Sequence, residues 1–307
     1  MNMKGTKTML EVKNITKYYN TVKAVDNLSF KVKDGEIFGL LGENGAGKTT
    51  TFRIIMNLIE ANKGTVLLNK EKINYNNVNQ IGFVTEERSL LTKLTVIEQL
   101  CFYGALKGLS EDEVDKEATK WLTKFAITNY KNRKIKELSK GNQQKIQFIS
   151  AIIGTPKLLI LDEPFTGLDP INVKIMKEAI YELQKTGTSI IFSSHQMEYI
   201  EDFCEQLIIL VKGHPVVSGS IKKIKEDFQI KNIIIKGENL PIDEIKQISG
   251  VLDIIIKKEE LEVKLEDISV APLVFSKIKD CNITKYELQE PSLNEIFIAK
   301  VGGSNND

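Results

Sequence analysis

The sequence predicts an α/β core that is split by a helical insert and followed by a small α+β domain. Short β-rich runs alternate with helical stretches before residue 88 and after residue 155, whereas the part between them is helical in character. Beyond residue 220 the order becomes βαββαβ, which is the ferredoxin-like order. The expected domains are 1–220, with a core of 1–87 and 156–220 and a helical subdomain of 88–155, and an accessory domain of 221–307.

Apolar runs and their boundaries place the elements of the core. Residues 9–41 are read as strands around a turn at 34–35, where Asp and Gly supply the backbone angles that a tight turn needs. The apolar run 36–41 ends at a glycine-rich loop, and residues 49–59 have helical apolar spacing. Further strands are expected at 64–68, 81–84, 158–161, 189–193 and 207–211, and a further helix at 171–185.

The C-terminal part is expected to form a small domain of its own. Its strands are predicted at 231–236, 251–257, 260–265 and 283–288, and its helices at 242–248 and 271–279. Residues 291–300 are expected to close the domain as a helix, and residues 302–307 to form a frayed tail. The 13 basic and 16 acidic residues from 221 to 307 form no nucleic-acid patch. A role of this domain in dimerisation or regulation is a hypothesis.

Composition excludes several classes of protein. Hydrophobic residues make up 42% and charged residues 27% of the 307 residues, which is typical of a globular protein and not of a disordered or fibrous one. The 42 basic and 41 acidic residues nearly cancel, so no strong field points to nucleic acid or an anionic membrane. Apolar runs are too short to cross a bilayer, and no secretory signal is expected. Cys101, Cys204 and Cys281 match no metal spacing and are expected to be reduced, buried thiols of a cytoplasmic protein.

Residues 42–49 (Gly-Glu-Asn-Gly-Ala-Gly-Lys-Thr) fit the P-loop pattern GxxxxGK[ST] between a predicted strand and a predicted helix. Glycines let the loop backbone wrap around an anion, and the N–H groups of the loop and of the helix N-terminus face the phosphates. Lys48 supplies a positive charge, and the Thr49 hydroxyl can bind Mg²⁺. The sequence therefore predicts a P-loop NTPase (RecA-like) core that binds nucleotide through Gly42, Asn44, Gly45, Ala46, Gly47, Lys48, Thr49 and Thr50.

Two adjacent carboxylates, Asp162 and Glu163, end the apolar run 158–161. Because side chains alternate along a strand, the two acids are expected to point in different directions. Asp162 can then hold the Mg²⁺ environment while Glu163 orients and deprotonates an attacking water, the two tasks that phosphoryl transfer to water requires. Two solvated acids at a strand end are the simpler alternative, but their place after a P-loop favours the catalytic interpretation.

A second helix start that suits an anion lies at Ser139. The Ser139 side chain can cap the helix that follows, and Gly141 lets the backbone approach a ligand closely. Considered alone, these two residues are weak evidence for an anion site, because most Ser-x-Gly sequences are ordinary helix caps.

Together, these motifs resemble the nucleotide-binding subunits of ATP-binding cassette (ABC) transporters, and the likeness runs in order from about Met9 to Gly219. Besides the P-loop and the two acids, the matching elements are Tyr19 as the adenine-stacking aromatic, Glu86 at the usual glutamine position, 138–142 in place of the LSGGQ signature, 166–169 as the D-loop, and 193–195 with the switch histidine. Tyr18 is the alternative to Tyr19 for the aromatic.

The resemblance implies an ATPase whose sites are shared between two subunits, most simply two identical chains. Each ATP would lie between the P-loop of one subunit and Ser139 and Gly141 of the other. Asp169 would communicate across the interface, and His195 would contact the γ-phosphate and position the attacking water. The catalytic residues would be Glu163, His195 and Lys48, and Mg²⁺ would be held by Thr49, Asp162 and Glu86.

Two departures from the family pattern affect this interpretation. Glu86 is a carboxylate where the family has a neutral amide; its oxygens suit Mg²⁺, but its charge repels the γ-phosphate unless a metal compensates. Lys140 and Asn142 replace the glycine and glutamine of the signature, whereas Ser139 and Gly141 are kept. With these features and its βαββαβ tail, the chain is similar to bacterial export-type ATPases, such as sodium-extrusion and antibiotic- or bacteriocin-resistance systems.

The predicted function is that of the motor subunit of an exporter. ATP would close two subunits, hydrolysis would reopen them, and the helical subdomain would pass the motion to separate transmembrane permease subunits at the inner face of the membrane. No nucleic-acid partner is expected. A soluble ABC ATPase acting on ribosomes or DNA is the alternative, but such proteins usually carry two cassettes or a long coiled coil, and this sequence has one P-loop and no sustained heptads. A P-loop kinase or GTPase leaves the signature and switch residues unexplained, and a nucleotide-regulated binding module would not hydrolyse ATP.

Overall fold

The computed structural model describes residues 7–228 and 231–302. The chain divides into two compact units, Met1–Ser218 and Gly219–Asp307, and each has its own hydrophobic core. Within the described ranges, no helix combines the length and the apolar character needed to span a membrane. Of the tail predicted for 302–307, Gly302 is instead the last residue of a helix, and residues 303–307 lie outside the described residues.

In the first unit, the N-terminal strands form an antiparallel sheet. Its strands, in order across the sheet, are β2 (Val22–Lys33), β1 (Thr8–Tyr19), β4 (Lys63–Leu68) and β5 (Glu71–Lys72). A two-residue turn joins β1 to β2, and its first residue, Asn20, has a φ of 53°, which Asn tolerates better than most residues. The turn therefore leaves Tyr19 at the very end of the hairpin.

A mainly parallel sheet forms the centre of this unit. Its strands, in order, are β10 (His214–Ser220), β9 (Gln206–Val211), β3 (Ile37–Leu41), β8 (Ser189–Ser193), β7 (Leu158–Asp162) and β6 (Ile81–Val84). β3, β7 and β8 are buried along their whole length, as expected for parallel strands covered on both faces. Their carboxyl ends lead to the P-loop, to Asp162–Glu163 and to 193–195, so the parallel packing brings three motifs to one edge of the sheet.

The helix after the P-loop is shorter than predicted. α1 spans Lys48–Ile55, whereas the apolar spacing predicted a helix as far as Ile59. Asn57 has a φ of 55°, which takes the backbone out of the right-handed helical path. Met56 and Ile59 still pack against the core, but from the connecting segment. The apolar spacing thus reported burial correctly and overestimated the length of the helix.

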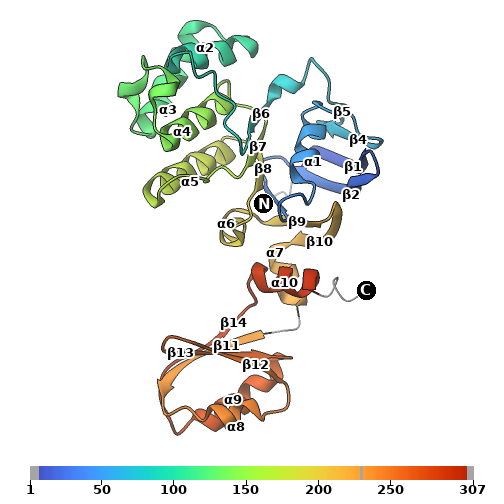
Figure 1. Cartoon of the computed structure of the whole chain (residues 1–307), viewed down its shortest axis with the longest axis vertical. Coiled ribbons are helices and arrows are strands. Elements are labelled where there is room, and N and C mark those ends of the chain that lie inside the picture. The colour runs from blue at the N-terminus through green and yellow to red at the C-terminus, as the bar shows by residue number, and fades with distance from the viewer. Residues whose placement is uncertain (1–6, 229–230, 303–307) are drawn as a thin grey trace, which may run out of the picture. The chain divides into compact units, whose positions relative to one another are not determined.

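Helices form the predicted insert, at the opposite side of this unit from β1 and β2 (Figure 1). They are α2 (Val96–Leu106), α3 (Glu111–Lys124) and α4 (Lys140–Ile152). Thr95 and Ser110 begin α2 and α3 with capping boxes, in which each hydroxyl and a glutamate three residues later satisfy the free N–H groups. Phe125 and Phe148 pack edge to face between the helices, with ring centroids 5.7 Å apart. Two further helices of this unit, α5 (Pro170–Lys185) and α6 (Met197–Phe203), follow β7 and β8.

The second unit has the predicted βαββαβ order. Its sheet consists of β12 (Val251–Lys257), β13 (Glu260–Leu265), β11 (Lys231–Glu238) and β14 (Asn282–Gln289), in that order and with every neighbouring pair antiparallel. α8 (Ile242–Lys246) and α9 (Ala271–Ile278) share one apolar core with it. α7 (Ile221–Asp227) precedes the sheet, and α10 (Leu293–Gly302) follows it. The expected small α+β domain is confirmed.

The three cysteines are free, but they are not all buried. Cys204 lies in the core, whereas Cys101 and Cys281 are partly exposed, so the prediction of three buried thiols was wrong for two of them. Cys101 lies next to Leu100, which faces the core from α2, and the helical turn directs the cysteine away from that buried stripe.

Candidate nucleotide-binding site

The P-loop connects β3 to α1, and its shape depends on glycine. Gly47, directly before α1, has a φ of 104°, and a Cβ atom there would lie 2.5 Å from the carbonyl oxygen of Ala24. At Gly42, with a φ of 154°, a Cβ atom would lie 2.6 Å from the carbonyl oxygen of Leu210. Only a residue without a side chain fits these two positions. The loop consequently winds closely between β2 and β9 and ends at a helix N-terminus, where backbone N–H groups can receive an anion.

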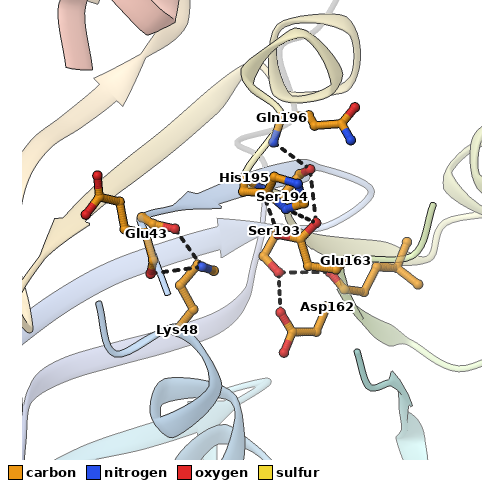
Figure 2. Close-up of polar contacts among 10 residues, drawn as sticks. Glu43, Lys48, Asp162, Glu163, Ser193, Ser194, His195 and Gln196 are labelled. Atoms are coloured by element: carbon orange, nitrogen blue, oxygen red, sulfur yellow. Dashed lines mark hydrogen bonds and ion pairs between the residues drawn. The ribbon is translucent and has the colours of Figure 1, made fainter. Parts of the chain in front are cut away.

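The loop backbone holds the ammonium group of Lys48. The residue is 7% exposed, and its Nζ donates to the carbonyl oxygen of Gly42 at 2.6 Å and to that of Glu43 at 3.3 Å (Figure 2). These bonds place a buried positive charge within the loop that is predicted to receive phosphates.

A cavity of about 240 Å³ opens at this loop. Its walls are formed by Ala24, Glu43, Asn44, Gly45, Gly47, Lys48, Thr49, Thr50, Glu86 and Asp162. The cavity therefore brings most of the predicted phosphate-binding residues together with both carboxylates predicted to bind the metal. The predicted site residues that do not line it are Tyr19, Gly42, Ala46, Ser139, Gly141, Glu163, Asp169 and His195.

Asp162 links the P-loop helix to the neighbouring strand. The residue is 2% exposed; its Oδ1 accepts from the Ser193 hydroxyl at 2.6 Å and its Oδ2 from the Thr49 hydroxyl at 3.3 Å. Burial raises the pKa of the Asp162 carboxyl, and the Ser193 bond and the charge of Lys48 only partly oppose this effect. A cation beside Asp162 would favour its charged form, so this buried oxygen donor suits a metal ion.

The Glu163 side chain points toward residues 193–195, the switch segment, and not toward the cavity. Its φ of 51° lies in the left-handed region, which is uncommon for a residue other than glycine and is often found at functional sites. Its Oε1 accepts from the backbone N–H of His195 at 2.6 Å, and its Oε2 lies 2.9 Å from His195 Nδ1 and 3.3 Å from the Ser194 hydroxyl (Figure 2). Glu163 is 6% exposed, whereas the imidazole of His195 is 58% exposed. A buried carboxylate thus holds an accessible histidine beside the P-loop edge of the sheet.

Glu86 follows β6 and reaches the cavity from a segment that is fastened to α4. Gln147 of α4 is 4% exposed, and its Nε2 donates to the carbonyl and hydroxyl oxygens of Thr85, both at 2.9 Å, and to the carbonyl oxygen of Glu87 at 3.4 Å. The backbone on both sides of Glu86 is therefore positioned by this one side chain.

The predicted partner-facing residues lie at exposed helix starts. Ser139 caps α4 by accepting from the Asn142 N–H at 3.3 Å, and Asp169 caps α5 by accepting from the Asn172 N–H at 3.0 Å. Both Ser139 and Asp169 are exposed, and Gly141 is partly exposed. The same chain does not bring them into its own cavity, so they are available to another molecule.

Tyr19 is 44% exposed and Tyr18 is 38% exposed at the end of the β1–β2 hairpin. Lys17 Nζ lies 5.6 Å from the centroid of the Tyr19 ring, and Lys23 Nζ lies 5.8 Å from that of the Tyr18 ring. Each ring is thus covered on one face by an ammonium group.

Sequence reasoning missed several residues that shape the site. Ser193 donates to Asp162, and it lies two positions before His195 in the same motif. Its place in that motif was the sequence signal that could have identified it. Ala24 and Glu43 line the cavity without belonging to the predicted set. No sequence signal marks Gln147, because its partners, two backbone carbonyls and the Thr85 hydroxyl, lie about 60 residues away along the chain.

Comparison with known proteins identifies the relatives of this chain. Residues 25–166 match the family model "ABC transporter", and residues 219–301 match "ATP-binding protein DrrA1-3-like, C-terminal domain". The chain is 47% identical over 300 residues to the ABC transporter ATP-binding protein YhaQ of Bacillus subtilis, covering 96% of this chain and 99% of that protein. It is 30% identical to the linearmycin resistance ATP-binding protein LnrL of the same organism, covering 97% of this chain and all of that protein.

Solved structures share the fold. The ATP-binding cassette MJ0796, in a dimeric post-hydrolysis state bound to ADP and Pi, superposes with a TM-score of 0.64 at 25% identity, over 69% of this chain and 99% of that chain. Both relatives are covered over nearly their full length, two domain models match, and a solved cassette shares the fold. The chain therefore belongs to the family of ATP-binding subunits of ABC transporters, which are ATPases.

Proposed function

We propose that this chain is the Mg²⁺-dependent ATPase motor of an exporter and that its P-loop site works only when a second copy closes over it. The observation that carries the proposal is the meeting of Lys48, Asp162 and the Glu163–His195 pair at one edge of the central sheet. A cation, a metal-binding acid and a base with its own orienting partner are the groups that phosphoryl transfer to water needs.

Glu163 acts as the general base. Its carboxylate accepts two hydrogen bonds from residues 193–195 and lies 2.9 Å from His195 Nδ1, and its backbone lies in the left-handed region, so the side chain has a defined direction away from Asp162. His195 is exposed on the far side of that carboxylate and can contact the γ-phosphate and orient the water. Lys48 stabilises the negative charge of the phosphates.

Thr49, Asp162 and Glu86 would hold Mg²⁺. All three line the cavity and offer oxygen atoms, the donors that Mg²⁺ prefers, and the buried carboxyl of Asp162 favours a cationic neighbour. When bound with ATP, the ion supplies positive charge at the phosphates. Glu86 carries a charge where the family has an amide, and this charge is compensated when the ion is present.

A second copy supplies the other half of the site. Ser139 and Gly141 lie at an exposed helix start outside the chain's own cavity, and a helix start of this kind can face the phosphates held by another chain. Asp169, exposed at the start of α5, lies at the same interface in this arrangement. The related cassette MJ0796 is dimeric in its post-hydrolysis state, which supports a homodimer.

The permease contacts a groove beside α2. A cavity of about 180 Å³ is lined by Met56, Ile81, Gly82, Phe83, Ser89, Tyr103, Lys107, Gln147, Ser150 and Ala151. Phe102 and Leu106 of α2 are exposed, at 47% and 63%. Gln147 lines this groove and also holds the segment that carries Glu86, so a permease helix in the groove can sense the nucleotide site. The chain would then be attached to the cytoplasmic face of the membrane through the permease.

The experiment uses a tagged Glu163→Gln variant, incubated with ATP and Mg²⁺ and pulled from detergent-solubilised membranes of its native cell. The proposal predicts a polytopic membrane protein at near-equal stoichiometry with the tagged chain. The control combines Glu163→Gln with Tyr103→Asp, which places a charge in the groove; it should still dimerise with ATP but lose the membrane protein. Ribosomal or DNA-repair partners without a membrane protein would disprove the transport role.

A further inference from the structure

Lys17 and Tyr19 lie on the same side of β1. Side chains two residues apart in a strand point to the same face, and Lys17 Nζ lies 5.6 Å from the centroid of the Tyr19 ring. An ammonium group within about 6 Å of an aromatic centroid is attracted to the negative face of the ring. One face of Tyr19 therefore has a partner within the chain, and the ring is still 44% exposed.

The connection that follows α1 holds the Lys17 ammonium in place. Lys17 Nζ donates to the carbonyl oxygen of Glu60 at 2.7 Å. Two further bonds tie the same stretches together: the Tyr18 N–H donates to Asn62 Oδ1 and the Asn62 N–H to the carbonyl oxygen of Thr16, each at 2.8 Å. Because Glu60 and Asn62 follow the helix that begins in the P-loop, these bonds set the position of the hairpin end relative to the phosphate site.

A side chain at a hairpin end would otherwise rotate freely, and ordering it on binding weakens affinity. The fixed cation removes part of this loss because it selects the ring orientation before the ligand arrives. It also occupies one face of the ring, so a flat ligand must stack on the other face.

We propose that Lys17 is a positioning residue that orients the Tyr19 ring to receive the purine base of the nucleotide on its free face. The inference rests on the nucleotide site of the proposed function and on the expectation, from the family resemblance, that Tyr19 stacks on the base. It adds a residue that acts through Tyr19 and a structural link, through Glu60, between the base and phosphate parts of the site.

The neighbouring pair provides a matched control. Lys23 Nζ lies 5.8 Å from the Tyr18 ring, a geometry close to that of Lys17 and Tyr19. Lys23 also forms an ion pair with Asp26 at 2.8 Å. Removing Lys23 therefore takes a similar cation from the other tyrosine of the hairpin.

The experiment compares ADP with inorganic pyrophosphate, which has the diphosphate but no base. Affinities of the full-length chain are measured by titration calorimetry with Mg²⁺ for the wild type, Lys17→Met, Lys17→Arg, Lys23→Met, Tyr19→Ala and the double variant Lys17→Met/Tyr19→Ala. We expect Lys17→Met to weaken ADP binding about two- to fivefold, the size of an exposed cation–π contact, with pyrophosphate binding unchanged. Lys17→Arg, which keeps a cation that can lie over the ring, should retain ADP affinity better than Lys17→Met.

Loss of the whole base contact should cost more. Tyr19→Ala is expected to weaken ADP binding by about fivefold or more, and Lys17→Met should add nothing in that background. If Tyr19→Ala weakens ADP binding but Lys17→Met does not, or if Lys17→Met weakens pyrophosphate binding equally, Lys17 is not a positioning residue and the base site stands. If Tyr19→Ala has no effect, or if Lys23→Met gives the base-dependent loss, the base does not lie on Tyr19 and both claims fail.

Discussion

Replacing Lys107 with Met removes an ammonium group that lies at the end of α4. Lys107 Nζ donates to the carbonyl oxygens of Ala151 and Ile153, at 3.0 and 2.5 Å, where α4 has no further N–H groups to offer them. Burial lowers the pKa of Lys107 from 10.5 to about 8, and the charge of Glu117 opposes this effect. Methionine keeps a long flexible stem in the groove but has no group that titrates.

The lowered pKa sets the direction of the stability change. Between pH 10.5 and about 8, an unfolded Lys107 is charged while the folded one is neutral, so the unfolded state binds more protons. The contribution of Lys107 to the free energy of unfolding therefore falls as pH drops through this window and is flat below about pH 8. A pKa lowered from 10.5 to about 8 corresponds to a change of roughly 3 kcal/mol in the free energy of unfolding across this pH window. Because Lys107 is only partly buried in the groove, a change of about 1 to 3 kcal/mol is expected.

Trp121 reports this change directly. It is the single tryptophan, it lies on α3, and it is 4% exposed. Urea unfolding followed by its fluorescence at pH 7, 8, 9 and 10 should show the wild type gaining stability relative to Lys107→Met above pH 8. Lys116→Met removes an exposed ammonium from α3 and should follow the wild type. Parallel pH curves for the wild type and Lys107→Met would refute the reasoning.

Three further predictions concern the nucleotide site. Glu163→Gln should lower the steady-state ATPase rate by about 10² to 10⁴, the usual effect of losing a positioned base, and a rate near wild type would exclude Glu163 from this role. Ser193→Ala removes a bond that lowers the pKa of Asp162, so the acidic limb of the kcat/KM profile should move to higher pH; an unmoved limb would count against metal binding by Asp162. Gly47→Ala places a Cβ against Ala24, and the backbone strain should weaken calorimetric ADP binding by about tenfold, whereas unchanged affinity would contradict the loop geometry.

Most of the fold could be predicted because its signals are local. Fully apolar runs such as 158–161 mark buried parallel strands. After residue 230, the βαββαβ order of predicted strands and helices marks the second sheet. The end of α1 could not be predicted, because Asn57 leaves the helical path while the apolar spacing continues to Ile59. Apolar spacing reports which side chains face the core and does not by itself report the backbone conformation between them.

The site was predictable only where a motif is continuous in sequence. The P-loop residues and Asp162 form such motifs, and the structure gathers most of them around one cavity. The contact between Glu163 and His195 depends on two neighbouring parallel strands and on a left-handed backbone at Glu163, which no local pattern indicates. Gln147 acts on backbone carbonyls far away in sequence, and such bonds leave no residue-type signal.

The central claim is that one ATP site is built from two chains, and mixing two inactive variants tests it most directly. Lys48→Ala disables the P-loop half, while Ser139→Asp keeps a capping side chain on α4 but places a negative charge against the phosphates. Each variant alone should hydrolyse ATP at a background rate. In an equimolar mixture, about half of the dimers pair one chain of each kind, and each of these mixed dimers has one of its two sites intact. Activity should therefore recover to about a quarter of the wild-type rate. A mixture that remains as inactive as its components would contradict the shared site.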